Sequence, residues 1–235
     1  SGSEKMTLDG AVNKTSIMLA VLISTAALSW NFPGPLMSLI SFVGIFAAGI
    51  SSVITFGFWV PFIGFVINPR PHLAPRTWLI FAAGEGFFIG LISLGFESMF
   101  PGIVLEAVSL TFCVAASLLF LYKSGLVKPS QNFVLMLCSA IFGIFLFYIG
   151  IFIYTLISGS SPEIFSGSSN ASIGLSLFVV GIAALSLVLD FDIIEQSAER
   201  GAPKYMEYFG AMALVTTLIW LYIEILRLLA KFRSR

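Results

Sequence analysis

Five carboxyl side chains stand inside long apolar segments of the sequence: Glu85, Glu106, Asp190, Asp192 and Glu224. An ionisable group in hydrocarbon is costly, so acids at such positions are functional candidates by default. Carboxyl groups that lie close together in a low-dielectric interior bind protons more tightly and share them. Carboxylate oxygens are also the ligands that Ca²⁺ prefers. We therefore expect these acids to respond to pH and to divalent cations.

Helical spacing predicts the direction in which each acid points, because residues three and four apart share a face. The face of Asp190 carries small and polar residues: Ser176, Val179, Ala183 and Ser186. Such a stripe packs against other helices rather than against lipid. Asp192 points the other way, near the expected end of its helix, where we expect hydration. Asp190 is thus the strongest candidate for a buried, functional acid.

The other three acids have small or polar neighbours on their own faces. Glu85 stands between two glycines, Glu106 lies above Ser109, and Glu224 lies above Thr217. We counted the depth of each acid in the membrane from its helix end, at about 1.5 Å per residue. Glu85 and Asp190 lie at one expected depth, and Glu106 and Glu224 lie together at another. We expect all of them to face a packed interior. Asp190 and Glu85 are the candidate calcium ligands, whereas Glu106 and Asp192 are candidates for the ion path.

Simpler structural roles remain open for three of these acids. Glu224 has Arg227 one turn further on, which favours a helix-end ion pair. Glu106 stands in the first turn of its helix, where the helix dipole favours an acid. Glu85 has the alternative of a protonated, hydrogen-bonded packing residue.

The elements that carry these acids follow from composition. Of 235 residues, 58% are hydrophobic and 10% are charged, with a mean hydropathy of +1.01. A soluble domain cannot bury so much apolar surface, which excludes soluble enzymes, disordered chains and nucleic-acid binders. One span needs about 20 apolar residues. The sequence predicts an all-α polytopic membrane protein with seven transmembrane helices, over residues 15–32, 36–67, 77–97, 102–122, 132–157, 171–195 and 207–230.

The termini flank this domain of residues 15–230. Residues 1–14 form the expected amino-terminal segment, of which 1–5 are interpreted as a cloning remnant or a trimmed terminus. We expect Pro61 to kink the second helix and residues 158–169 to form an irregular outer loop. Residues 231–235 form a basic tail.

The cations between the helices predict the orientation. Seven spans put most loop cations on one side: Lys5, Lys14, Arg70, Arg76, Lys123, Lys128, Arg200 and Lys204. The positive-inside rule therefore places the amino terminus in the cytoplasm. Lys231, Arg233 and Arg235 then lie outside, against the rule. Either the upstream helices overrule this tail, or the last segment is re-entrant; we expect seven full spans.

Catalytic and prosthetic-group motifs are missing from the sequence. The lysines all lie outside the expected mid-membrane segments, which excludes a retinal Schiff base, and His72 is the only histidine. A single histidine excludes bis-histidine haem and the paired-histidine zinc proteases. We expect neither an enzyme nor a cofactor.

Several short segments together resemble the Bax inhibitor-1-like integral membrane family, in its bacterial branch. They are Gly84–Ser93, Tyr122–Gly125, Leu189–Glu195, Glu199–Tyr205 and Leu221–Leu229. The resemblance implies a bundle of seven helices, six of them arranged around a central last helix. It also implies a pH-dependent calcium leak gated by a pair of acids on the last two helices. By the resemblance, Asp190 matches the acid of the sixth helix, and Glu224 its partner.

The sequence departs from that family pattern at the partner acid. Asp190 and Glu224 stand further apart than the family's pair, and counting from the loop places the partner at Val215 or Thr216, which do not ionise. Asp190 then has Glu85 as an alternative partner. The basic partner of the pair has three candidates: Arg70, Arg76 and Arg227.

These observations predict a pH-sensitive calcium (cation) leak channel gated by Asp190, Glu224 and Glu85. One alternative is a membrane regulator that transports nothing and binds a membrane protease or a stress-response partner. A second is a proton-coupled transporter of a small solute. We expect a monomer in the bacterial inner (plasma) membrane, whose partners are the lipid bilayer, Ca²⁺ and protons.

Overall fold

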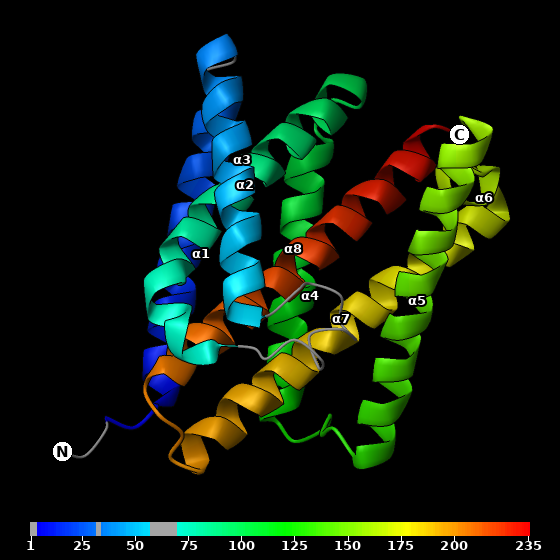
Figure 1. Cartoon of the computed structure of the whole chain (residues 1–235). Coiled ribbons are helices and arrows are strands. Elements are labelled where there is room, and N and C mark those ends of the chain that lie inside the picture. The colour runs from blue at the N-terminus through cyan, green and yellow to red at the C-terminus, as the bar shows by residue number, and fades with distance from the viewer. Residues whose placement is uncertain (1–3, 32–33, 57–69) are drawn as a thin grey trace. The chain divides into compact units, whose positions relative to one another are not determined.

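The computed structural model describes residues 4–31, 34–56 and 70–235. Its regular elements are helices (Figure 1): α1 (Leu8–Asn31), α2 (Pro35–Phe56), the 3₁₀ turn η1 (Pro71–Leu73), α3 (Ala74–Met99), α4 (Ile103–Lys123), α5 (Gln131–Ser158), α6 (Glu163–Ser166), α7 (Asn170–Glu199) and α8 (Tyr205–Arg233). The prediction of an all-α protein is confirmed.

Six helical segments among the described residues are long and apolar enough to cross a membrane: Leu8–Asn31, Pro71–Met99, Ile103–Lys123, Gln131–Ser158, Asn170–Glu199 and Tyr205–Arg233. The chain is therefore a polytopic membrane protein. A shorter apolar stretch, Leu39–Ser51, lies within α2. The rest of the expected second span, residues 57–67 with Pro61, lies outside the described residues, so the count of seven remains a prediction.

Local signals explain where the helices begin and end. The Ser130 hydroxyl accepts a hydrogen bond from the Phe133 backbone N–H (3.2 Å) and so caps the start of α5. Gly159 ends the same helix in the left-handed region, at φ 73°, where a residue without a Cβ is favoured. Gly201 takes the same conformation, at φ 66°, in the turn between α7 and α8.

Helix bounds differ from expectation at several places. Helix α1 begins at Leu8 rather than at residue 15, and α7 continues to Glu199 rather than ending at 195. Polar residues extend both helices: along α7, the Gln196 amide donates a hydrogen bond to Asp192 Oδ2 (2.6 Å) one turn earlier. An apolar run marks only the part of a helix that lipid covers. The expected loop 158–169 also contains the short helix α6.

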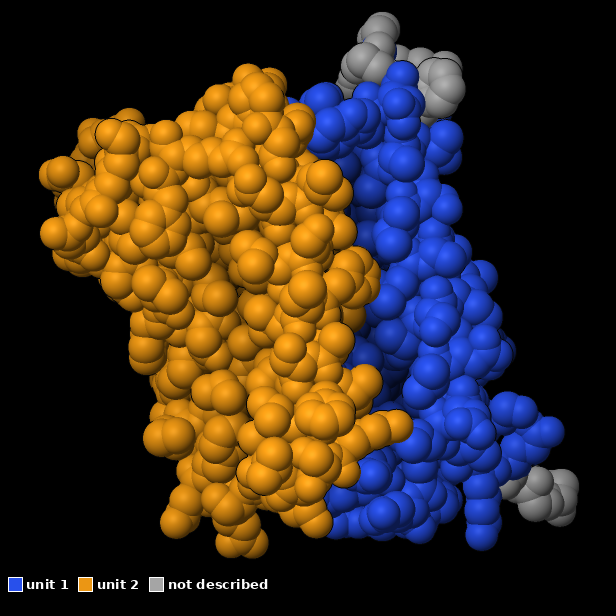
Figure 2. Space-filling model, turned by 180° about the vertical axis from the view of Figure 1, so that it is seen from behind, with its two compact units in different colours: residues 1–95, 190–216 blue, residues 96–189, 217–235 orange. Residues whose placement is uncertain are grey.

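The chain forms two compact units, coloured in Figure 2. Unit 1 comprises residues 1–95 and 190–216, and unit 2 comprises residues 96–189 and 217–235. Helices α7 and α8 therefore contribute residues to both. Within unit 1, α3 packs closely on α1: a Cβ at Gly86 would overlap the Thr25 hydroxyl, and one at Gly90 would overlap the Ser29 hydroxyl. Small residues at these positions let the two backbones approach.

Candidate functional site

A buried carboxylate lies within unit 2. Helix α8 carries Glu224, which is 2% exposed. The Tyr148 hydroxyl, from α5, donates a hydrogen bond to its Oε1 atom (2.7 Å). Arg227 Nη1 lies 3.0 Å from each of the two carboxylate oxygens. The carboxylate is therefore held by a cation and a hydroxyl at once, as a buried charge requires.

The Arg227 guanidinium connects this carboxylate to two aromatic rings. It lies 5.6 Å from the ring centroid of Tyr148 and 4.7 Å from that of Phe165 in α6. Its Nη1 also donates to the Tyr148 hydroxyl (2.9 Å). Helix α6, which interrupts the expected loop, thus covers the arginine with an aromatic face, an arrangement that favours a cation. Glu224, Arg227 and Tyr148 form one triad.

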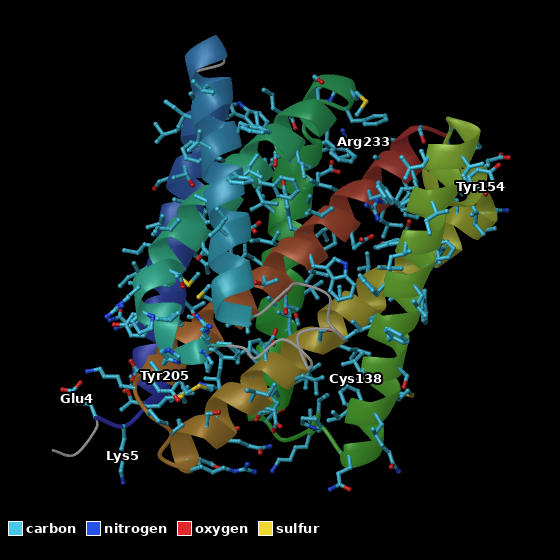
Figure 3. The ribbon with its side chains drawn as sticks, in the orientation of Figure 1. Glu4, Lys5, Cys138, Tyr154, Tyr205 and Arg233 are labelled. Atoms are coloured by element: carbon cyan, nitrogen blue, oxygen red, sulfur yellow. The ribbon has the colours of Figure 1, made fainter. Side chains whose placement is uncertain are left out.

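The end of α8 beyond the triad is rich in cations with partners inside unit 2. Lys231 is 5% exposed and donates to the Ser172 carbonyl (3.2 Å) and the Ser176 hydroxyl (2.8 Å) of α7. Arg233, labelled in Figure 3, donates to the Pro101 carbonyl (2.7 Å) and to Glu106 Oε1 (2.6 Å). The tail cations that the positive-inside rule left unexplained therefore bind the start of α7 and the α3–α4 turn.

Asp190 and Glu85 lie in unit 1, on α7 and α3. Both are half-buried, and the Oδ2 atom of Asp190 is buried. The stripe predicted on the Asp190 face is buried at every position: Ser176 (3%), Val179 (2%), Ala183 (0%) and Ser186 (7%). Glu85 stands between the buried glycines Gly84 and Gly86. Both acids thus lie in closely packed stretches of membrane-spanning helix.

The two ion-path candidates are placed differently. Glu106 faces outward, with half of its side chain exposed (52%), and pairs with Arg233. The expectation that it faces a packed interior is therefore wrong, because the first turn of α4 lies at an exposed turn. Asp192 is half-buried and accepts a hydrogen bond from Gln196.

The three candidate basic partners lie in different surroundings. Arg227 is the cation beside Glu224, whereas Arg70 and Arg76 are exposed. Neither Arg70 nor Arg76 forms an ion pair with any of the residues that the structure describes. Val215 is fully buried, and the Thr216 hydroxyl donates to the Met212 carbonyl of its own helix (2.8 Å). The positions counted from the loop thus supply packing rather than charge.

From the sequence, we missed two residues that bind buried polar groups in unit 2. Tyr148 stands in an apolar run and looks there like one more aromatic, and Lys231 looks like a tail cation. Both meet their partners across long sequence separations, which spacing along one helix does not reveal. Within residues 4–31, 34–56 and 70–235, three or more His, Cys, Asp or Glu side chains never gather as a metal ligand set would require.

The family described as "Bax inhibitor 1 like" matches residues 1–234. No curated protein matches the chain.

Proposed function

Because the chain belongs to the Bax inhibitor 1-like family, we propose that it is a pH-sensitive calcium (cation) leak channel gated by buried carboxyl groups. The observation that carries this proposal is the placement of Asp190. Asp190 is a half-buried acid on a membrane-spanning helix, and the small and polar residues that share its helix face are all buried. An acid in such surroundings is expensive to retain and is a functional candidate for that reason.

In the proposed mechanism, Asp190 is the gating acid and Glu85 the second proton-binding group. Ca²⁺ is the cargo. Proton binding changes the charge of the packed interior and shifts the helices between two packings, one closed and one conducting. Carboxylate oxygens on α3 and α7 provide weak binding sites for the cation along its path through the protein.

The triad of Glu224, Arg227 and Tyr148 has a second role in this proposal. The carboxylate is engaged with Arg227 and Tyr148, so it is a latch rather than a ligand for calcium. Loss of the Glu224–Arg227 contact would leave a cation between two aromatic rings. The latch therefore holds α5 and α6 against α8 within unit 2.

A flux assay tests the role of Asp190. The full chain is reconstituted in liposomes that contain a Ca²⁺-sensitive dye, and efflux is measured between pH 5 and pH 8. We expect Asp190→Asn to change the rate and to flatten its pH dependence, because an amide does not titrate. The matched control is Glu199→Gln, an exposed acid at the end of the same helix, which we expect to keep the wild-type profile. If Asp190→Asn behaves as wild type, Asp190 has no part in gating.

The same preparation separates the alternatives. A membrane regulator gives no flux in any variant and co-purifies with a membrane protease or another partner. A proton-coupled transporter acidifies the liposome interior only when its solute is added. The orientation with a cytoplasmic amino terminus, in the inner membrane of a bacterium, belongs to the same proposal and is supported by the clustering of loop cations.

A further inference from the structure

A second buried acid, outside the set considered for gating, holds the amino-terminal segment. Glu207, in the first turn of α8, is 2% exposed. Its Oε1 atom accepts hydrogen bonds from the backbone N–H of Thr7 (2.9 Å) and from the Thr7 hydroxyl (3.1 Å). Thr7 immediately precedes α1, so a side chain of the last helix grips the start of the first.

The contact has the chemistry of a capping box assembled from two helices. The Thr7 hydroxyl accepts from the Gly10 N–H (3.0 Å), and its carbonyl from the Ala11 N–H (3.1 Å), which makes Thr7 the N-cap of α1. In an ordinary capping box the residue at the position of Gly10 is a glutamate or glutamine that reaches back to the N-cap N–H. Here Glu207 does so, and a Cβ at Gly10 would overlap its carboxylate.

The residues before Thr7 bind the turn between α7 and α8. The Met6 N–H donates to the Ala202 carbonyl (2.7 Å), and the Lys204 N–H donates to the Glu4 carbonyl (2.9 Å). These bonds flank an antiparallel bridge between Lys5 and Pro203. Figure 3 shows Glu4 and Lys5 near Tyr205, where α8 begins. Glu4 and Lys5, left aside as a terminal remnant, are therefore part of the fold.

Side-chain contacts reinforce this pairing. Met6 is 3% exposed and packs with Ala11 of α1 and Ile194 of α7. The Lys204 ammonium pairs with the Glu4 carboxylate. This ammonium lowers the pKa of Glu4, and the carboxylate in turn raises the pKa of Lys204, so both are charged at neutral pH. The pair is exposed, so it contributes little alone.

We propose that residues 4–7 form a clasp, positioned by Glu207, that ties the α7–α8 turn to the start of α1. The clasp restrains the movement of α7 and α8 relative to α1. Detachment would strip Glu207 of both Thr7 donors and expose Met6 in one step. These costs arise together, so the clasp opens as a unit. Helix α7 carries Asp190, and α8 carries Glu224. The regulatory half of this inference, that clasp release speeds the leak, rests on the proposed function.

Hydrogen exchange of the full chain in lipid nanodiscs tests the clasp without reference to transport. In Glu207→Ala, we expect the amides of Met6 and Lys204 to exchange about tenfold faster or more, since a charged acceptor is lost from a buried site. Gly10→Ala, whose new methyl displaces the carboxylate, should act in the same direction. The control is Gly49→Ala, a helical glycine of α2 with no atom within 4 Å of the added Cβ.

A double variant separates a clasp from a mere helix cap. Gly10→Glu combined with Glu207→Ala restores a capping box within α1 but breaks the tie to α8. A clasp predicts that the Lys204 amide stays fast in this variant. Its return to the wild-type rate would show that Glu207 only caps α1, and unchanged exchange in Glu207→Ala and Gly10→Ala would overturn the clasp. Unchanged exchange in α5 peptides shows that each variant is folded.

Calcium efflux from liposomes tests the regulatory half. We expect Glu207→Ala to leak faster than wild type, by at most the factor seen in exchange, because coupling cannot exceed the free energy of the clasp. Faster exchange with unchanged efflux would overturn the restraint on the leak. If even the wild type does not leak, the proposed function fails, whereas the exchange data still decide the clasp.

Discussion

A single hydroxyl group completes the buried triad of unit 2. The Tyr148 hydroxyl donates to Glu224 and accepts from Arg227, so it is satisfied on both sides. The spacing of Glu224 and Arg227 along one helix made their ion pair foreseeable from sequence. The hydroxyl was not foreseeable, because it comes from α5 and faces α8 only in the folded chain.

We expect Tyr148→Phe to lower the free energy of unfolding by about 1–3 kcal/mol, because it leaves a buried charged acceptor with one donor fewer. Unfolding of the purified protein in mixed micelles, titrated with a denaturing detergent, measures this change. Tyr154→Phe is the control, since Tyr154 lies on the same helix but is 51% exposed (Figure 3). Equal losses in the two variants would contradict the assigned role of the hydroxyl.

At the scale of elements, glycines decide how closely helices pack. Gly86 and Gly90 of α3 stand four residues apart, a spacing that lets another helix approach closely. This spacing does not identify the helix that packs against α3, because any helix with small side chains on one face could pack there. The structure identifies α1, whose backbone carbonyl at Ala26 would lie 2.7 Å from a Cβ at Gly90. Backbone atoms yield less readily than a flexible side chain, so the helices would have to separate.

Gly90→Ala should destabilise the protein by roughly 1–3 kcal/mol through overpacking. Gly95→Ala, on the same helix, should be neutral or stabilising by up to about 1 kcal/mol, because its Cβ meets no atom within 4 Å and alanine favours a helix. The opposite signs distinguish packing from helix propensity. Detergent-induced unfolding of both variants measures them, and a stabilising Gly90→Ala would refute the close contact.

At the scale of the whole molecule, hydropathy predicted the helical class and most spans, since lipid selects long apolar helices. Local sequence patterns did not predict the helix ends that polar residues extend. They also did not predict the short helix α6, which covers Arg227. Nor did they predict the clasp: residues 4–7 look like a solvated tail, and only contacts with residues about two hundred positions away order them.

The expected orientation is testable by labelling. In a background with Cys113 and Cys138 replaced by serine, single cysteines at Lys5 and Lys128 should react with an impermeant maleimide from the cytoplasmic side. Cysteines at Ser160 and Ser234 should react from the opposite side, since α8 then crosses completely. All four positions are exposed. Labelling of Ser234 from the cytoplasm would show a re-entrant last segment and contradict the topology.

Helices α7 and α8 contain 30 and 29 residues, and at about 1.5 Å per residue each is roughly 44 Å long. The hydrocarbon layer is about 30 Å thick. Their surplus length has to be accommodated by tilting or by protruding into the headgroups, at a cost that varies with lipid chain length. We therefore expect the rate of calcium efflux to vary with the chain length of the lipid around the helices that carry Asp190 and Glu224.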